Sequence, residues 1–250
     1  MMQRASSAPA HDGPVLLLHG GGVAGWMWDP LRSHLTAEHR LLVPDLPGHG
    51  RNAADPYVSH AETTAALAQL LEEEGGSATV VGFSLGAQLA VRLAAERPDL
   101  VDRVVVISAQ ATPMRGTAAT LAVLGALSGL ARQRWFAKLQ ARQLYIPDEL
   151  LPEYIRTSAG ISRETLLRSV EENLRFVVPT AWGAFPGDAL ILVGAAEKAL
   201  MKRSAAALDA ALPQSTLQVV DGCGHGIPLQ RPAWLAQRIE DWLAGTAERP

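Results

Sequence analysis

Short runs of apolar residues alternate with longer helix-like stretches along most of this 250-residue chain. The run 15–18 is apolar at every position, and so are 104–107 and 189–193. A strand that is apolar on both faces is typical of a parallel sheet with helices on both sides. Because helical stretches separate the runs, the pattern predicts right-handed βαβ units. We therefore expect an α/β fold with a doubly wound, mainly parallel sheet.

The alternation also predicts where each element lies. Strands are expected at 15–18, 40–43, 78–81, 104–107, 189–193 and 216–220. Helices are expected at 26–35, 61–74, 87–96, 200–212 and 233–244. Between 112 and 182 the alternation stops, and only helical stretches occur, at 117–138, 147–159 and 162–176. We expect a core formed by 13–111 and 183–250, with 112–182 inserted as a helical lid.

Residues 82–86 read Gly-Phe-Ser-Leu-Gly and lie between a predicted strand and a predicted helix. This is the nucleophile-elbow pattern Gly-x-Ser-x-Gly, in which a sharp turn exposes the serine hydroxyl. Glycines stand on both sides because the turn brings neighbouring backbone too close for a Cβ atom. The pattern predicts that the hydroxyl oxygen of Ser84 is the reaction centre.

Further motifs accompany the elbow in a fixed order. The run 19–22 (His-Gly-Gly-Gly) follows the first strand, and 45–50 (Asp-Leu-Pro-Gly-His-Gly) follows the second. The run 222–225 (Gly-Cys-Gly-His) follows the last strand, beyond the helical insertion. In this order the chain resembles the α/β-hydrolase superfamily over 13–243, as a carboxylesterase-like serine hydrolase with a helical lid. One departure is that too few residues precede Val15 for the family's usual N-terminal hairpin.

The resemblance implies a base and an acid that activate Ser84, since a free serine hydroxyl is a poor nucleophile at neutral pH. His225 lies in a glycine-rich loop where the family places its catalytic imidazole, so we expect it to be the general base.

The family's acid usually follows the strand after the lid in the pattern Gly-x-x-Asp. Here that position holds Glu197, and glutamate is an accepted variant of the triad; a weakened, dyad-like site is the alternative. The family's occasional second acid position, after 104–107, holds Ser108 and no carboxylate. Three other carboxylates are less suitably placed: Asp188, Asp209 and Asp221.

A tetrahedral oxyanion needs two fixed hydrogen-bond donors. The residue after the nucleophile, Leu85, would supply one backbone N–H at the start of a helix. We expect Gly21 to supply the other, with Gly22 as the alternative, because a glycine turn lets the substrate oxygen approach the backbone. A phosphate-binding loop is disfavoured, since no Gly-Lys-Ser/Thr follows and the Rossmann glycine spacing is absent.

The remaining histidines are expected to play supporting parts. His19 is predicted to brace the glycine turn. His49 is predicted to brace its own loop, with a position at the mouth of the site as the alternative. Four histidines have no such setting and are expected at the surface: His11, His34, His39 and His60.

Composition restricts the cofactors and partners. The net charge of −3 gives no excess of basic residues with which to bind nucleic acid. The single cysteine, Cys223, cannot form an internal disulfide and fits a reducing cytoplasm. No metal-ligand motif occurs, so no metal or other cofactor is expected. The N-terminus shows no secretory signal, and the apolar stretch 118–131 is too short to span a bilayer. We expect that stretch to form a buried or pocket-lining helix and the protein to have no membrane role.

The motifs favour a serine hydrolase that cleaves carboxylic esters of small to medium, fairly apolar substrates through an acyl-enzyme. The substrate preference rests on the apolar lid, in which Trp135, Phe136 and Tyr145 are the predicted substrate contacts. The same triad could serve a lactonase, thioesterase, amidase, carbon–carbon bond hydrolase or cofactor-free haloperoxidase. A non-catalytic ligand-binding receptor on this scaffold is the alternative from another class, left open by the glutamate at 197. The oligomeric state is not indicated.

Overall fold

The computed structural model describes residues 13–129 and 133–245, and a six-stranded sheet lies at its centre. The strand order is β2-β1-β3-β4-β5-β6, and all pairings between neighbours are parallel. The strands are β1 (Val15–Leu18), β2 (Leu41–Leu42), β3 (Ala78–Phe83), β4 (Val101–Ile107), β5 (Asp188–Gly194) and β6 (Ser215–Val220). The predicted parallel α/β fold is confirmed.

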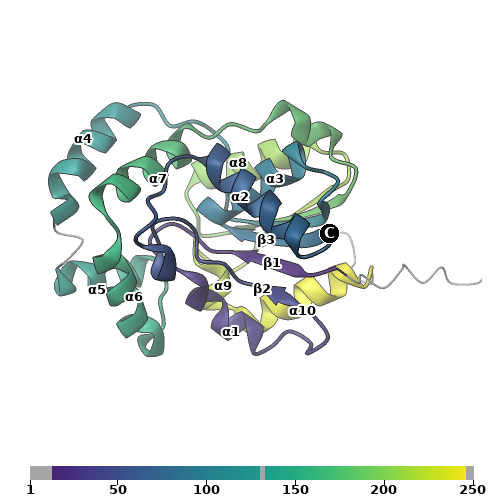
Figure 1. Ribbon diagram of the computed structural model, residues 1–250, viewed down its shortest axis with the longest axis horizontal. Helices are drawn as coiled ribbons and strands as arrows, with labels where there is room; N and C mark the ends of the chain where they lie inside the picture. Colours follow the sequence, from purple (N-terminus) through teal and green to yellow (C-terminus); the bar gives the residue numbers. More distant parts are fainter. Residues whose placement is uncertain (1–12, 130–132, 246–250) are drawn as a thin grey trace, which may run out of the picture.

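Helices cover both faces of this sheet (Figure 1). On one face these are α2 (His60–Glu73), α3 (Leu85–Glu96) and α8 (Ala199–Ala211); on the other they are α1 (Asp29–Arg32), α9 (Ile227–Gln230) and α10 (Pro232–Leu243). Successive strand residues enter different apolar clusters: Val104 and Val106 belong to one, Val105 and Ile107 to the other. The all-apolar runs of the sequence are therefore strands buried on both faces.

Among the described residues between β4 and β5, which cover most of the predicted lid, the regular elements are helices and no strand occurs. They are α4 (Thr117–Leu127), α5 (Arg134–Gln143), α6 (Leu151–Gly160) and α7 (Arg163–Arg175), with a short 3₁₀ turn at Asp148–Leu150. These helices gather beyond one end of the sheet, on the left in Figure 1. There α4 packs against α7 and α5 against α6, while α7 also contacts α3, the helix that follows the elbow.

Two predicted helices have different limits in the structure. The single helix expected at 117–138 is wrong: α4 ends at Leu127, ahead of Ser128 and Gly129, which are weak helix formers. The helix expected at 26–35 is also wrong. A 3₁₀ helix, Gly25–Trp28, precedes the single turn α1, because Pro30 has no N–H to donate and is tolerated only in a helix's first turn.

α4 is unusual because it carries no charged side chain and is nevertheless largely exposed. Of its residues only Thr117 and Gly125 are buried, while Val123 is 59% and Leu127 49% exposed. Of the two alternatives expected for this stretch, α4 is the pocket-lining helix and not the buried one, since Val123, Leu124 and Leu127 line a cavity. No helix in the described part of the chain is long and apolar enough to cross a membrane.

Candidate active site

Ser84 lies at the tight turn between β3 and α3, with φ 52° and ψ −110°. A positive φ is strained for serine, and such strain is typical of a nucleophile elbow. A Cβ atom at Gly86 would overlap the carbonyl oxygen of Leu18, and one at Gly82 would come within 2.6 Å of Ala87 Cα. The two glycines are therefore required because β1 and α3 pack directly against the turn.

A chain of hydrogen bonds joins Ser84 to the predicted base and acid. His225 Nε2 lies 3.1 Å from Ser84 Oγ, and His225 Nδ1 lies 2.9 Å from Glu197 Oε2. Because a carboxylate can only accept, Nδ1 carries the proton of the neutral ring and Nε2 directs its lone pair at the serine hydroxyl. This tautomer is the one that a general base requires.

Glu197 is held rigidly after β5, where its side chain is 1% exposed. Its Oε1 accepts hydrogen bonds from Ser108 Oγ at 2.6 Å and from the Gly194 N–H at 3.0 Å, which leaves Oε2 for His225. Burial raises the pKa of Glu197, but hydrogen bonds from His225, Ser108 and Gly194 outweigh it and hold the pKa below its ordinary value. The carboxylate therefore stays ionised opposite the imidazole.

The sequence predicted no role for Ser108, which follows β4 with φ 55°. It reaches Glu197 because β4 and β5 are neighbours in the sheet, so their carboxyl ends meet at one edge. The sequence signal was present: Ser108 occupies the family's second acid position, and its hydroxyl donates to Glu197.

Three backbone N–H groups beside the elbow have no acceptor within the described ranges: those of Gly21, Gly22 and Leu85. All three residues line the same cavity as Ser84. Leu85 begins α3, so the partial positive charge of the helix N-terminus adds to its N–H. The two glycines remain equivalent candidates for the second donor.

His19 ties the glycine turn to the loop after β2. Its Nδ1 donates to the Gly20 carbonyl oxygen at 2.8 Å, and its Nε2 accepts the Leu46 N–H at 2.9 Å. Both ring nitrogens are thereby used, and burial lowers the pKa of His19 to about 3. The ring is neutral and braces the turn, as predicted.

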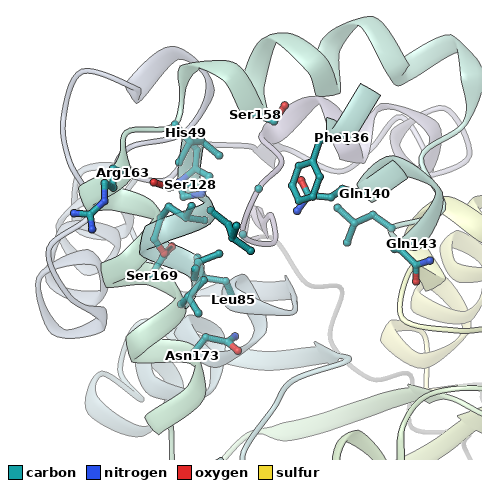
Figure 2. Close-up of a pocket in the computed structure, with 18 of the residues that line it drawn as sticks. His49, Leu85, Ser128, Phe136, Gln140, Gln143, Ser158, Arg163, Ser169 and Asn173 are labelled. Atoms are coloured by element: carbon teal, nitrogen blue, oxygen red, sulfur yellow. Dashed lines mark hydrogen bonds between the residues drawn. The ribbon is translucent and has the colours of Figure 1, made fainter. Parts of the chain in front are cut away.

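A cavity of about 860 Å³ opens over Ser84, and residues of α4, α5, α6 and α7 line it. Figure 2 shows Phe136, Gln140 and Gln143 on one side of it, with Ser169 and Asn173 on the other. The lining is aliphatic, aromatic or polar and uncharged, apart from the rim residue Arg163, its one formally charged member among the described residues. Such a cavity suits a ligand that is largely apolar.

The three predicted substrate contacts lie in different surroundings. Phe136 lines the cavity, whereas Trp135 and Tyr145 are not among its described lining residues. Trp135 is 60% exposed and meets Phe136 edge-on, with ring centroids 5.6 Å apart. Tyr145 packs against Gly224 in the loop that carries His225. Tyr145 therefore contacts the loop of His225 and not the described lining of the cavity.

His60 is only 2% exposed, so its predicted surface position is wrong. Its Nε2 lies 2.9 Å from Gln88 Oε1 on α3, and its backbone N–H donates to Glu172 Oε2 on α7 at 2.8 Å. Asn173 Nδ2 donates to the same Gln88 oxygen at 3.1 Å. The buried position arises because α7 folds over the start of α2, a contact between segments about 110 residues apart that no local pattern reveals.

The other histidines expected at the surface differ among themselves. His34 is exposed, whereas His39 is half-buried and lies 2.9 Å from Glu240 Oε2. His11 lies outside the described residues.

Among the described residues, Glu197 is the carboxylate hydrogen-bonded to His225, and the other three carboxylates considered for the acid are not. Asp188 is exposed at the opposite end of β5, and Asp221 is exposed. Asp209, near the end of α8, accepts a hydrogen bond from Ser215 at the start of β6. Within 13–129 and 133–245, no cluster of three or more His, Cys, Asp or Glu side chains could hold a metal ion.

Related proteins and solved structures of similar fold include esterases. The chain is 30% identical to the pimeloyl-[acyl-carrier protein] methyl ester esterase of Aromatoleum aromaticum, over 92% of this chain and 98% of that protein. It is 31% identical to the magnesium-chelatase 30 kDa subunit of Rhodobacter capsulatus, over 94% of this chain and 88% of that protein. A thermophilic esterase from Thermogutta terrifontis has the same fold, with a TM-score of 0.77 at 22% identity, covering 94% of this chain and 91% of that one.

A family model described as the alpha/beta hydrolase family matches residues 15–238, which include the elbow, the glycine turn and the loop of His225. This match spans nearly the whole described chain and agrees with the parallel sheet and the helices that cover it. The chain therefore belongs to the alpha/beta hydrolase family.

Proposed function

We propose that this protein is a serine hydrolase that cleaves carboxylic esters of small to medium, fairly apolar substrates through an acyl-enzyme. The observation that carries the proposal is the hydrogen-bonded chain from Ser84 through His225 to Glu197 beside an apolar cavity. Esterases among the related proteins support an ester as the substrate.

In the proposed first step, Ser84 Oγ attacks the ester carbonyl carbon while His225 Nε2 takes the hydroxyl proton. The C–O bond to the alcohol then breaks, and the protonated ring gives its proton to the departing alkoxide. Water repeats the sequence on the acyl-enzyme and releases the acid. Throughout, Glu197 holds Nδ1–H and stabilises the cationic ring.

The N–H of Leu85 and that of Gly21, with Gly22 as the alternative, are proposed to bind the oxyanion formed in each step. Their freedom from other acceptors supports this role, because preorganised donors need no rearrangement when the charge develops. Removing one such donor typically costs about 10²–10³-fold in kcat.

The segment 112–182 is proposed to act as the lid that shapes the substrate site. Each of its helices contributes to the cavity lining, for example through Leu124 on α4, Phe136 on α5, Tyr154 on α6 and Val170 on α7. The acyl or alcohol part of a substrate would therefore be enclosed by side chains of this segment and not by the sheet.

A fluorophosphonate probe and 4-nitrophenyl esters of rising acyl length test the proposal. We expect covalent labelling at Ser84 and turnover of the esters, with both lost in Ser84→Ala. An absence of label and turnover in the folded wild-type protein would refute a serine hydrolase.

A parallel screen of lactones, thioesters and amides distinguishes the other reactions that the same residues could perform. A C–C bond hydrolase or haloperoxidase would be recognised by its product. A receptor would bind ligands in the cavity with neither label nor product.

A further inference from the structure

His49 is held in a fixed position by the loop that follows β2. Its backbone N–H donates to the Leu46 carbonyl oxygen at 3.0 Å, and its own carbonyl oxygen accepts the Asn52 N–H at 2.9 Å. Asp45 secures the same loop by accepting two hydrogen bonds from Arg51. The side chain of His49 is therefore placed before any ligand binds, which lowers the entropic cost of binding.

One ring nitrogen of His49 serves this loop. Nδ1 lies 2.9 Å from the carbonyl oxygen of Pro47, and because a carbonyl can only accept, Nδ1 carries the proton. Burial lowers the pKa of His49 below its ordinary value, so the ring is neutral at physiological pH. In this tautomer Nε2 is a hydrogen-bond acceptor with no proton.

The second ring nitrogen is available to a ligand. His49 is 1% exposed but lines the cavity together with Ser84, and Figure 2 shows it among the surrounding side chains. Nε2 has no hydrogen-bond partner among the described residues. It is also absent from the fully buried side-chain nitrogen and oxygen atoms that have no partner. An unpaired acceptor in a largely apolar cavity attracts a donor, since burying it unpaired costs free energy.

The position of His49 relates this acceptor to the reacting carbonyl. Its ring centroid lies 5.3 Å from that of His19, whose Nδ1 is bonded to the backbone of the glycine turn. Both nitrogens of His19 are occupied, so it cannot supply the missing donor. Gly21, Ser84 and His49 line one cavity, so a substrate whose carbonyl oxygen lies at Gly21 shares that cavity with His49 Nε2.

We propose that His49 Nε2 accepts a hydrogen bond from the substrate, and that the enzyme selects esters carrying a hydroxyl or amide N–H close to the scissile carbonyl. The inference rests on the proposed ester hydrolysis and adds the substrate class. One donated hydrogen bond corresponds to a preference of about threefold to tenfold in kcat/KM.

Two substitutions separate recognition from loop bracing. His49→Asn places an amide nitrogen near the Nδ1 position, so it retains the donor to Pro47 and loses the acceptor in the cavity. His49→Gln extends an amide to the Nε2 position, so it retains an acceptor there and loses the donor to Pro47. A purely structural histidine would tolerate Asn better than Gln, whereas a substrate-binding one would show the opposite order.

The substrates are methyl 3-hydroxybutanoate and methyl 3-methoxybutanoate, with the 2-substituted pair assayed in the same way. Hydroxyl and methoxy groups are similar in electron withdrawal, but only the hydroxyl donates. We expect the wild type and His49→Gln to prefer the hydroxy ester by about threefold to tenfold in at least one pair, and His49→Asn to lose that preference. Because each ratio is taken within one protein, a general loss of activity or of folded protein does not affect it.

Equal hydroxy-to-methoxy ratios in the wild type and His49→Asn, for both pairs, would overturn the inference while leaving ester hydrolysis intact. A retained preference in His49→Asn with loss in His49→Gln would assign His49 to loop bracing alone. If the wild type hydrolyses no ester and Ser84 takes no fluorophosphonate label, the proposed function itself has failed.

Discussion

Replacing Glu197 by glutamine tests the hydrogen-bonded chain at its most constrained point. In the wild type, Oε1 accepts from Ser108 and from the Gly194 N–H, while Oε2 faces His225 Nδ1. The Gly194 N–H can only donate, so the glutamine oxygen must remain at the Oε1 position. Its NH₂ group then faces His225, forces Nδ1 to accept, and moves the ring proton to Nε2. With that proton in place, His225 cannot take the proton of Ser84.

The size of the effect follows from the alternative orientation of the amide. Rotating it would restore the correct tautomer but would lose the hydrogen bond from Gly194 and leave buried donors unpaired, at about 2–3 kcal/mol. The productive orientation is then populated on the order of 1%, which alone lowers kcat about 10²-fold. Loss of the carboxylate charge, which stabilises the protonated ring, extends the fall toward about 10⁴-fold. We therefore expect Glu197→Gln to raise the activation free energy by about 3–5.5 kcal/mol.

Steady-state hydrolysis of a 4-nitrophenyl ester measures kcat, and the rate of fluorophosphonate labelling at Ser84 should fall with it. Nitrogen-15 NMR of the histidine ring reports directly whether the proton has moved to Nε2. Asp221→Asn is the matched control, since it makes the same chemical change at an exposed carboxylate near His225 in the sequence and should retain activity. A fall of less than about tenfold in Glu197→Gln, with the protein folded, would refute the reasoning.

Three further predictions concern the surroundings of this chain. Ser108→Ala removes one donor to the acid and should lower kcat about threefold to tenfold with KM unchanged in steady-state kinetics; an unchanged kcat would contradict the assigned contact. Gly86→Ala should lower the free energy of unfolding in urea by more than about 3 kcal/mol, because the new Cβ overlaps the backbone next to β1. Gly129→Ala is the control: open space surrounds this position, so its free energy of unfolding should stay within about 0.5 kcal/mol of the wild type. The hydrogen bond from His60 lowers the pKa of Glu172 to about 2, so its contribution to stability is complete above about pH 4.5 and is lost as the pH falls toward 2. Glu172→Gln should therefore be less stable than the wild type at pH 7 by about 1–2 kcal/mol, allowing for solvent screening of a partly exposed group, and chemical unfolding should show the difference shrinking in acid; a constant difference would contradict the assignment.

The parallel sheet was predictable because its signals are local. Val104 to Ile107 are all apolar, and that pattern directly reflects burial on both faces. The elbow is equally local, because the backbone of the turn itself demands glycine at 82 and 86. His225 and Glu197 could be named because each follows a strand, and parallel strands bring their carboxyl ends to one edge.

Other features depended on contacts between distant segments. The exposure of α4 could not be predicted from its composition, since a helix without charged residues is expected to be buried. Trp135 and Phe136 are neighbours of similar character, and only the packing of α5 on α6 decides which one faces the cavity. The buried position of His60 likewise arises from its contact with α7, about 110 residues away in the sequence.

The sequence by itself determined the sheet, the position of the elbow and the identities of the residues that the tertiary structure brings together around Ser84. These follow from residue types and from spacing along the chain, which act locally. Only the tertiary structure decided that Ser108 donates to Glu197, that His49 Nε2 has no hydrogen-bond partner among the described residues, and which side chains line the cavity. Those properties depend on which atoms of separate segments come within contact or hydrogen-bonding distance. The residue pattern within one segment does not reveal which other segments it will contact.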